Sequence, residues 1–449
     1  MKALRPSRML WKEGTWWAWK FWVYGCLLDV EGENPEEGPT EEIVRLCKAL
    51  RHAPKLRQTL PSSNKNLIRD DGAEALAGVL ATKALQALEK ADLSTNFMGE
   101  EGAQQVLETL QKSCAPLLKE LDMSGNVLGD TGAETLAGAL EKGQLSRLEK
   151  LDCSETGMQE GGVELISRAL ARKKAPSLKE LRLAVNEMGD NGACELAKAI
   201  EGGALEGLEV LDVAGTTNDD PTEEEQFADP PPFGGRGAQK LFGSFQKTKG
   251  PKLKEVHVSG CKLKDKGAKA LAGALEADGL PQLETLTLVE TEIGNTGAEQ
   301  ICNALSKGKA PGLKNLVLMS VPLGSRSTQA LSSALQGGAL KGLELLDLGG
   351  CKLGKANAQK LCEALGKGQV PKLRHLNLYD NDGGDDLVLA LAEVLRNGAL
   401  RELQYLDVGG NGPSEKGITK LFDALKTGEA PLLRDILGFD EAEESEEGA

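Results

Sequence analysis

The chain has 449 residues, a formal net charge of −15 and an isoelectric point near 5.0. Binding to a nucleic-acid backbone requires clustered Lys and Arg, so this acidic balance excludes nucleic acid as the main partner. The nine cysteines form no C-x-x-C pair, which favours reduced thiols packed as small apolar side chains in a cytosolic or nuclear compartment.

The N-terminal segment, residues 1–39, has a composition unlike the rest of the chain. It contains all five tryptophans, which are Trp11, Trp16, Trp17, Trp19 and Trp22, interleaved with Lys and Arg. Its apolar run, residues 16–28, contains Lys20 and is too short to span a bilayer. We expect this segment to be poorly ordered. Contact with a membrane surface and a cap over the first repeat are the two alternatives that the residues leave open.

A leucine pattern, L-x-x-L-x-L, recurs eleven times along the chain. The copies begin at Leu88, Leu118, Leu148, Leu178, Leu208, Leu253, Leu283, Leu313, Leu343, Leu373 and Leu403. All but one of the intervals are thirty residues long. Self-similarity at a fixed period of this size predicts a solenoid, in which each repeat buries its apolar face against its neighbours.

One repeat, residues 118–147, illustrates the unit. Apolar and polar residues alternate over residues 118–123, which predicts a short strand. A Gly-Asp-Thr-Gly turn at 129–132 precedes residues 133–141, where apolar side chains recur at helical spacing. Lys142 and Gly143 supply a cation and a glycine that are typical of a helix end. Each repeat is therefore predicted to be strand, turn and helix.

One position at a fixed offset after each predicted strand is polar or cysteine in all repeats but one. The eleven residues are Asn96, Asn126, Thr156, Asn186, Thr216, Cys261, Thr291, Val321, Cys351, Asn381 and Asn411. All except Val321 can form hydrogen bonds, so we expect them to satisfy backbone groups where the chain turns inward.

These repeats resemble the ribonuclease-inhibitor-like class of leucine-rich repeats, with L-x-x-L-x-L-x-x-N/C followed by G-x-x-G-A. The resemblance extends over roughly Leu56 to Leu433. It implies an α/β fold, a curved horseshoe with parallel strands on the concave face and helices on the convex face. We assign residues 40–433 to this solenoid and residues 434–449 to an acidic tail. At the first, atypical repeat Gln58, Pro61 and Ser63 stand where the strand leucines are expected.

The interval between Leu208 and Leu253 holds fifteen extra residues. They predict an acidic loop insertion near residues 217–236, between a strand and a helix. A long loop in a repeat array is either functional or a tolerated disordered excursion, and the second interpretation is favoured. Arg236 lies at the end of this segment.

The strand positions between the leucines should line the concave face. Their central column contains an acidic stripe, Asp92, Asp122, Asp152 and Asp212, in the N-terminal half. This stripe could steer a basic partner or simply be a soluble surface. The C-terminal half presents a different set, which we name the C-terminal patch: Val317, Met319, Leu345, His375, Tyr379 and Tyr405. Leu345, His375 and Tyr405 share one repeat offset, so we expect them side by side, as in an interface hot spot.

The sequence carries no signature of an enzyme: P-loop, H-E-x-x-H and G-x-S-x-G motifs are absent, and the three histidines lie far apart. We therefore expect neither a cofactor nor a metal. The favoured prediction is a monomeric, non-catalytic scaffold that binds a protein partner on its concave face. The alternative rests on the resemblance of the repeats and acidic tail to activators of the GTPase Ran, which implies Arg236 as the activating arginine.

Overall fold

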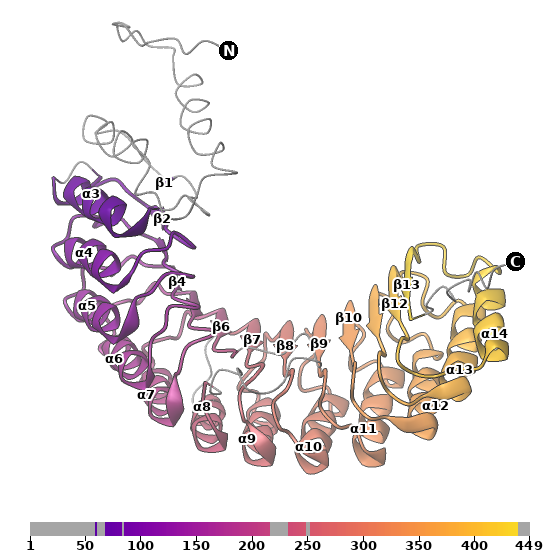
Figure 1. Ribbon diagram of the computed structural model, residues 1–449. Helices are drawn as coiled ribbons and strands as arrows, with labels where there is room; N and C mark the ends of the chain where they lie inside the picture. The colour runs from indigo at the N-terminus through magenta and orange to yellow at the C-terminus, as the bar shows by residue number, and fades with distance from the viewer. Residues whose placement is uncertain (1–58, 61–67, 83–84, 216–231, 248–251, 439–449) are drawn as a thin grey trace, which may run out of the picture.

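The computed structural model describes residues 59–60, 68–82, 85–215, 232–247 and 252–438. Within these ranges thirteen strands form one sheet in chain order, and the strands pair in parallel. Figure 1 shows the strands along the inside of an arch and the helices along its outside. The curved α/β solenoid expected from the period of thirty residues is confirmed. Residues 1–39, most of the loop insertion and the tail from residue 439 lie outside the described residues, and the expectations for them stay predictions.

The strands each contain two or three residues. They are β1 (Thr59–Leu60), β2 (Lys90–Asp92), β3 (Glu120–Asp122), β4 (Lys150–Asp152), β5 (Glu180–Arg182), β6 (Val210–Asp212), β7 (Glu255–His257), β8 (Thr285–Thr287), β9 (Asn315–Val317), β10 (Leu345–Asp347), β11 (His375–Asn377), β12 (Tyr405–Asp407) and β13 (Asp435–Leu437). Because β13 belongs to the sheet, the repeat array extends past residue 433.

One helix follows each strand from β1 to β12. The helices are α3 (Arg69–Ala81), α4 (Glu100–Gln111), α5 (Gly129–Glu141), α6 (Glu160–Leu170), α7 (Gly189–Glu201), α8 (Gly235–Lys247), α9 (Lys264–Glu276), α10 (Asn295–Ser306), α11 (Ser325–Gln336), α12 (Gly354–Leu365), α13 (Gly384–Arg396) and α14 (Glu415–Leu425).

The repeated leucines form one continuous core between the strands and the helices. Leu118, Leu121 and Met123 of the repeat analysed above are almost completely buried. Burying such a side chain contributes about 1.5–3 kcal/mol, so the eleven copies of the pattern supply the main stabilisation of the array. The described cysteines pair in no disulfide, and all but Cys194 are buried. Burial raises the pKa of the Cys302 thiol to about 12, which keeps it protonated as an apolar filler.

The polar column after the strands joins each repeat to its neighbour. Asn126 Nδ2 donates to the carbonyl oxygen of Leu93, in the preceding repeat, at 2.8 Å and to that of Met123 at 2.9 Å. Its Oδ1 accepts from the backbone N–H of Asn96 and Met98 at 3.1 and 3.2 Å. The expectation for this column is confirmed at Asn126, because one side chain satisfies backbone groups on both sides of the turn. Thr216 lies outside the described residues.

Two local expectations are wrong. The Gly-Asp-Thr-Gly segment is not a turn before the helix but the first turn of α5 itself. At the first repeat Leu60, not Pro61, lies opposite Ala91. The strand β1 is thus shifted by one residue against the period. The physical reason is that proline has no N–H to donate and disfavours a paired strand position, whereas a leucine fits there.

The first turn of α5 also caps the helix of the next repeat. Asp130, in the first turn of α5, accepts hydrogen bonds at Oδ1 from the backbone N–H groups of Gln159 and Gly162, at 2.9 and 3.0 Å. Those two groups belong to the start of α6, so one helix caps the next. A Cβ atom at Gly162 would lie 2.5 Å from Asp130 Oδ1, which requires glycine. Asp70, Asp190 and Asp265 make the equivalent contacts to α4, α8 and α10.

Candidate interaction surface on the concave face

The concave face is built from strand positions that the sheet places in adjacent rows. The central row brings Asp92, Asp122 and Asp152 opposite one another, then Arg182 and Asp212. The predicted acidic stripe is therefore contiguous apart from Arg182. From β2 to β13 each strand pairs with the next without a shift. Residues at the same repeat offset therefore lie side by side in this row.

The carboxylates of the acidic stripe also close the turns after their strands. Asp122 Oδ1 accepts from the backbone N–H of Ser124 at 3.1 Å and from its hydroxyl at 2.6 Å. Asp152 makes the same pair of contacts to Ser154 at 3.1 and 2.8 Å. Such a local bond to a backbone N–H is a common way to end a strand. One oxygen of each carboxylate is therefore occupied by the fold.

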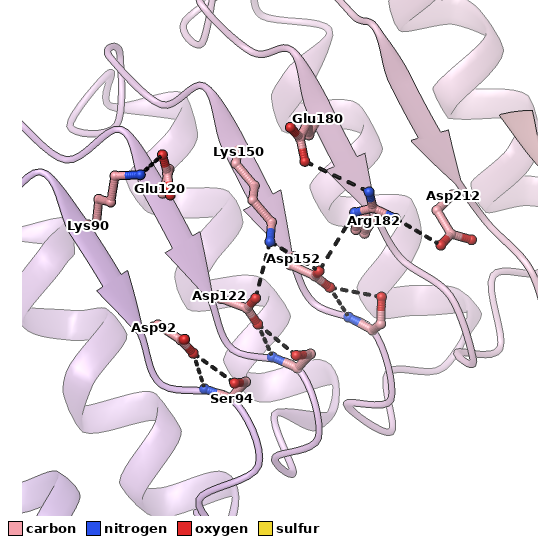
Figure 2. A network of polar contacts seen from close by, with 12 residues as sticks. Lys90, Asp92, Ser94, Glu120, Asp122, Lys150, Asp152, Glu180, Arg182 and Asp212 are labelled. Atoms are coloured by element: carbon pink, nitrogen blue, oxygen red, sulfur yellow. Dashed lines mark hydrogen bonds and ion pairs between the residues drawn. The ribbon is translucent and has the colours of Figure 1, made fainter. Parts of the chain in front are cut away.

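Cations lie beside the second oxygens of Asp122, Asp152 and Asp212, as Figure 2 shows. Lys150 Nζ lies 3.3 Å from Asp122 Oδ2 and 3.8 Å from Asp152 Oδ2. Arg182 lies between Asp152 and Asp212, at 3.9 and 3.5 Å. Burial, and secondarily repulsion from Asp122, raises the pKa of the Asp152 carboxyl. Of the two interpretations of the stripe, these contacts favour a soluble surface over one that steers a basic partner, because they leave less free negative charge.

The C-terminal patch lies in the same rows but differs in chemistry. Leu345, His375 and Tyr405 are direct neighbours in the register of β10, β11 and β12. The rings of His375 and Tyr405 have centroids 6.1 Å apart at 42°, within the range of aromatic contact. The side-by-side placement expected from their shared offset is confirmed.

The other three residues extend the patch. Val317 ends β9 in the central row, and Met319 follows two residues later, both half-buried. Tyr379 occupies the same repeat offset as Met319, in the turn after β11, and 46% of it is exposed. Gly349 and Gly409 hold this offset in the two adjacent repeats. Neither glycine has a side chain to cover the ring. The ring lies against Gly409, where an added Cβ atom would be 3.1 Å from Tyr379 Cδ2, and its other side faces the solvent.

Carboxylates border the patch. The Tyr405 hydroxyl donates to Asp407 Oδ2 at 3.4 Å, and burial together with Asp407 raises the pKa of the Tyr405 phenol. Burial also raises the pKa of the carboxyl of Asp347, which ends β10 two residues after Leu345. The nearby Arg374 lies 3.8 Å from Glu344 and so has its own counter-charge. The patch is thus an apolar and aromatic surface with an acidic rim.

Arg236 does not lie in a loop, as the sequence suggested, but in the first turn of α8. It is exposed and lines an open pocket of about 520 Å³ with residues at the starts of α9 and α10. Asp265 and Glu292 belong to the same pocket, and Glu292 lies 3.6 Å from Lys264. The insertion falls between a strand and a helix as expected, because β6 ends at Asp212 and α8 begins at Gly235. The end of the insertion is α-helical because Asp190 caps α8 through Gly234 and Gly237.

Two further features bear on chemistry. Among the described residues no group of three His, Cys, Asp or Glu side chains could hold a metal ion. No helix in the same ranges has the length and apolar content needed to cross a bilayer.

Sequence reasoning missed one surface feature, an exposed apolar pair at Phe97 and Val127. Their shared repeat offset was the signal that could have revealed it.

Comparisons with known proteins agree with the repeat assignment. A leucine-rich-repeat family model matches residues 115–137, 174–197 and 251–272. No curated protein matches the chain. Three solved structures are similar to this chain. The complex of Rad7 and Elc1 in yeast is 17% identical, with 89% of this chain and 91% of that chain covered and a TM-score of 0.42. A leucine-rich-repeat protein of Leptospira interrogans is 17% identical, with 79% and 73% covered and a TM-score of 0.40, and an internalin, inlF, from Listeria monocytogenes is 14% identical, with 85% and 100% covered and a TM-score of 0.43.

Proposed function

We propose that this leucine-rich-repeat protein is a non-catalytic scaffold that binds a protein partner through the C-terminal patch of its concave face. The observation that carries the proposal is the contiguous row of Leu345, His375 and Tyr405 beside the exposed ring of Tyr379. Tyr and other aromatic side chains dominate the binding energy of protein interfaces. Four of the six patch residues lie on strands, where little conformational entropy remains to be lost on binding.

The contrast with the rest of the face supports this location. The N-terminal strands present Lys, Asp, Glu and Arg side chains that pair with one another. A partner binding there would have to desolvate these ion pairs, which costs more than covering apolar groups. The C-terminal patch offers apolar area with carboxylates at its rim, so a matching partner surface is apolar at its centre and basic at its edge.

The test compares partners captured from cell extract by three forms of the protein. These are the wild type, a Leu345→Asp/Tyr405→Ala variant, and a control variant, Glu120→Asp/Glu180→Ala, altered at the same strand offset in the N-terminal half. We expect the wild type and the control to retain the same proteins and the patch variant to lose them. Truncating a hot-spot residue costs about 2 kcal/mol or more, roughly a thirtyfold loss of affinity.

Equal capture by all three forms would show that the partner does not use the patch. Circular dichroism and unfolding midpoints of the three forms must agree, so that loss of capture reports on the surface and not on the fold. A partner recovered only by the patch-intact forms is then titrated against the purified proteins to obtain the affinities directly.

A further inference from the structure

The two most exposed large apolar side chains of the described residues lie next to each other near the start of the array. They are Phe97, 62% exposed, and Val127, 52% exposed. Both occupy the same repeat offset, in the loops after β2 and β3. The backbone N–H of Val127 donates to the carbonyl oxygen of Met98 at 2.8 Å, so the two loops are in direct contact.

The backbone at Phe97 is in the left-handed region, with φ of 56°. This region disfavours a residue with a bulky side chain, by about 1–2 kcal/mol. The next left-handed residue at this offset is Gly157, with φ of 66°, and glycine carries no such penalty. Left-handed backbone recurs at this offset, at Glu292, Lys352 and Asp382, so it is a feature of the repeat. What distinguishes Phe97 is that it places an exposed aromatic ring at this position.

Acidic side chains surround the pair. Glu100 and Glu101 begin α4 directly after the Phe97 loop, and Glu155 lies in the loop next to Val127; all three are exposed. A ligand for this surface must therefore combine apolar or aromatic groups with positive charge.

We propose that the tryptophan-rich segment of the same chain, residues 11–22, packs on Phe97 and Val127. The first 22 residues carry all five tryptophans and five Lys or Arg residues against the single acid Glu13. Their composition thus complements an apolar pair with an acidic border. The chain that leads from this segment enters the sheet at β1, which pairs with β2, the strand of the Phe97 repeat.

The intervening chain, residues 23–58, is long enough for this contact. A random-coil chain of the same length would have a root-mean-square span of roughly 30–35 Å, far more than the roughly 5 Å between adjacent strands. Tethering gives the segment an effective concentration in the millimolar range. A contact of two apolar side chains and a few charges then suffices to hold it.

Tryptophan fluorescence of the full chain tests the proposal, because every tryptophan lies in residues 11–22. The Phe97→Ser/Val127→Ser variant should shift the emission maximum to longer wavelength and increase quenching by acrylamide, since the indoles become solvated. The matched control is Leu389→Ser, which alters a 40% exposed side chain on α13 and should leave both readings unchanged. Serine removes apolar surface at exposed positions, and equal circular dichroism confirms that the fold is retained.

Three outcomes would overturn the proposal. Identical emission from the wild type and the Phe97→Ser/Val127→Ser variant would show that the tryptophans do not contact this surface. Emission that changes on dilution of the wild type would assign the contact to a second copy of the chain. A blue shift that appears only with anionic phospholipid vesicles, equally in wild type and variant, would assign the segment to a membrane surface.

Discussion

The N-terminal and C-terminal halves of the concave face share one backbone and differ in what their strands display. From β2 to β6 the rows hold charged side chains joined into a network, with Arg182 between two aspartates. From β9 to β12 the same rows hold Val317, Leu345 and Tyr405. The core residues below both halves are equally buried. Stability is thus set by the leucine positions, and surface chemistry varies independently of them.

The largest expected effect tests the shared part of this comparison. Leu121→Ala and Leu376→Ala each remove a completely buried side chain, one in each half, and each should cost about 2–5 kcal/mol of unfolding free energy. Urea unfolding followed by circular dichroism measures both. If one substitution were nearly neutral, the two halves would not be packed alike.

The next effect concerns the joints between repeats. Asn126→Ala removes a side chain that bonds five backbone groups, whereas Cys351→Ala removes the contact from Sγ to the carbonyl oxygen of Leu318 at 3.1 Å. We expect a loss of about 3 kcal/mol for Asn126→Ala and about 1 kcal/mol for Cys351→Ala. The same urea experiment compares them, and equal losses would contradict the proposed role of the amide.

The charged network predicts a pH dependence in the N-terminal half. Asp152 is 8% exposed, and burial raises its pKa in the folded state above the ordinary value of 3.8. Its ionised form therefore lowers the free energy of unfolding at pH values above the raised folded-state pKa. This destabilisation decreases as the pH falls through that pKa. Removing the nearby cation by Arg182→Ala should increase this penalty at pH 7. The difference in unfolding free energy between wild type and variant should shrink as the pH is lowered towards 4. A difference that is independent of pH would show that Arg182 stabilises none of the three carboxylates it contacts, those of Asp152, Glu180 and Asp212.

The smallest expected effect on stability comes from ion pairs that occur in both halves, at the position just before each strand. Glu149 lies 2.6 Å from Lys179 and Glu284 lies 2.6 Å from Lys314. The hydrogen bond from Lys179 lowers the pKa of the Glu149 carboxyl. The stability it contributes is present above the ordinary value of 4.5 and is lost as the pH falls through the lowered folded-state pKa. Exposed pairs contribute little, so Glu149→Gln and Glu284→Gln should each shift the thermal midpoint only slightly, and less in high salt.

Some of the surface could be predicted from the sequence because parallel strands with a period of thirty residues pair without shifts. Leu345, His375 and Tyr405 were expected side by side for this reason, and they are. The sequence period places Arg182 in the row. It does not predict the contacts of Arg182 with Asp152 and Asp212, because a long side chain has many rotamers and the period does not determine which one it adopts. The left-handed backbone at the exposed Phe97 was not expected either, since backbone dihedral angles in loops depend on the hydrogen bonds of neighbouring repeats.

The sequence by itself determined the repeat, its strand–helix order and the buried leucine core, because these follow from apolar periodicity alone. Only the tertiary structure decided where neighbouring repeats meet. It placed Asp130 at the start of the next helix and Leu60, not Pro61, opposite Ala91. It also paired the acidic stripe with Lys150 and Arg182. Such contacts join residues of different repeats through particular distances and hydrogen bonds, which a one-dimensional pattern does not contain.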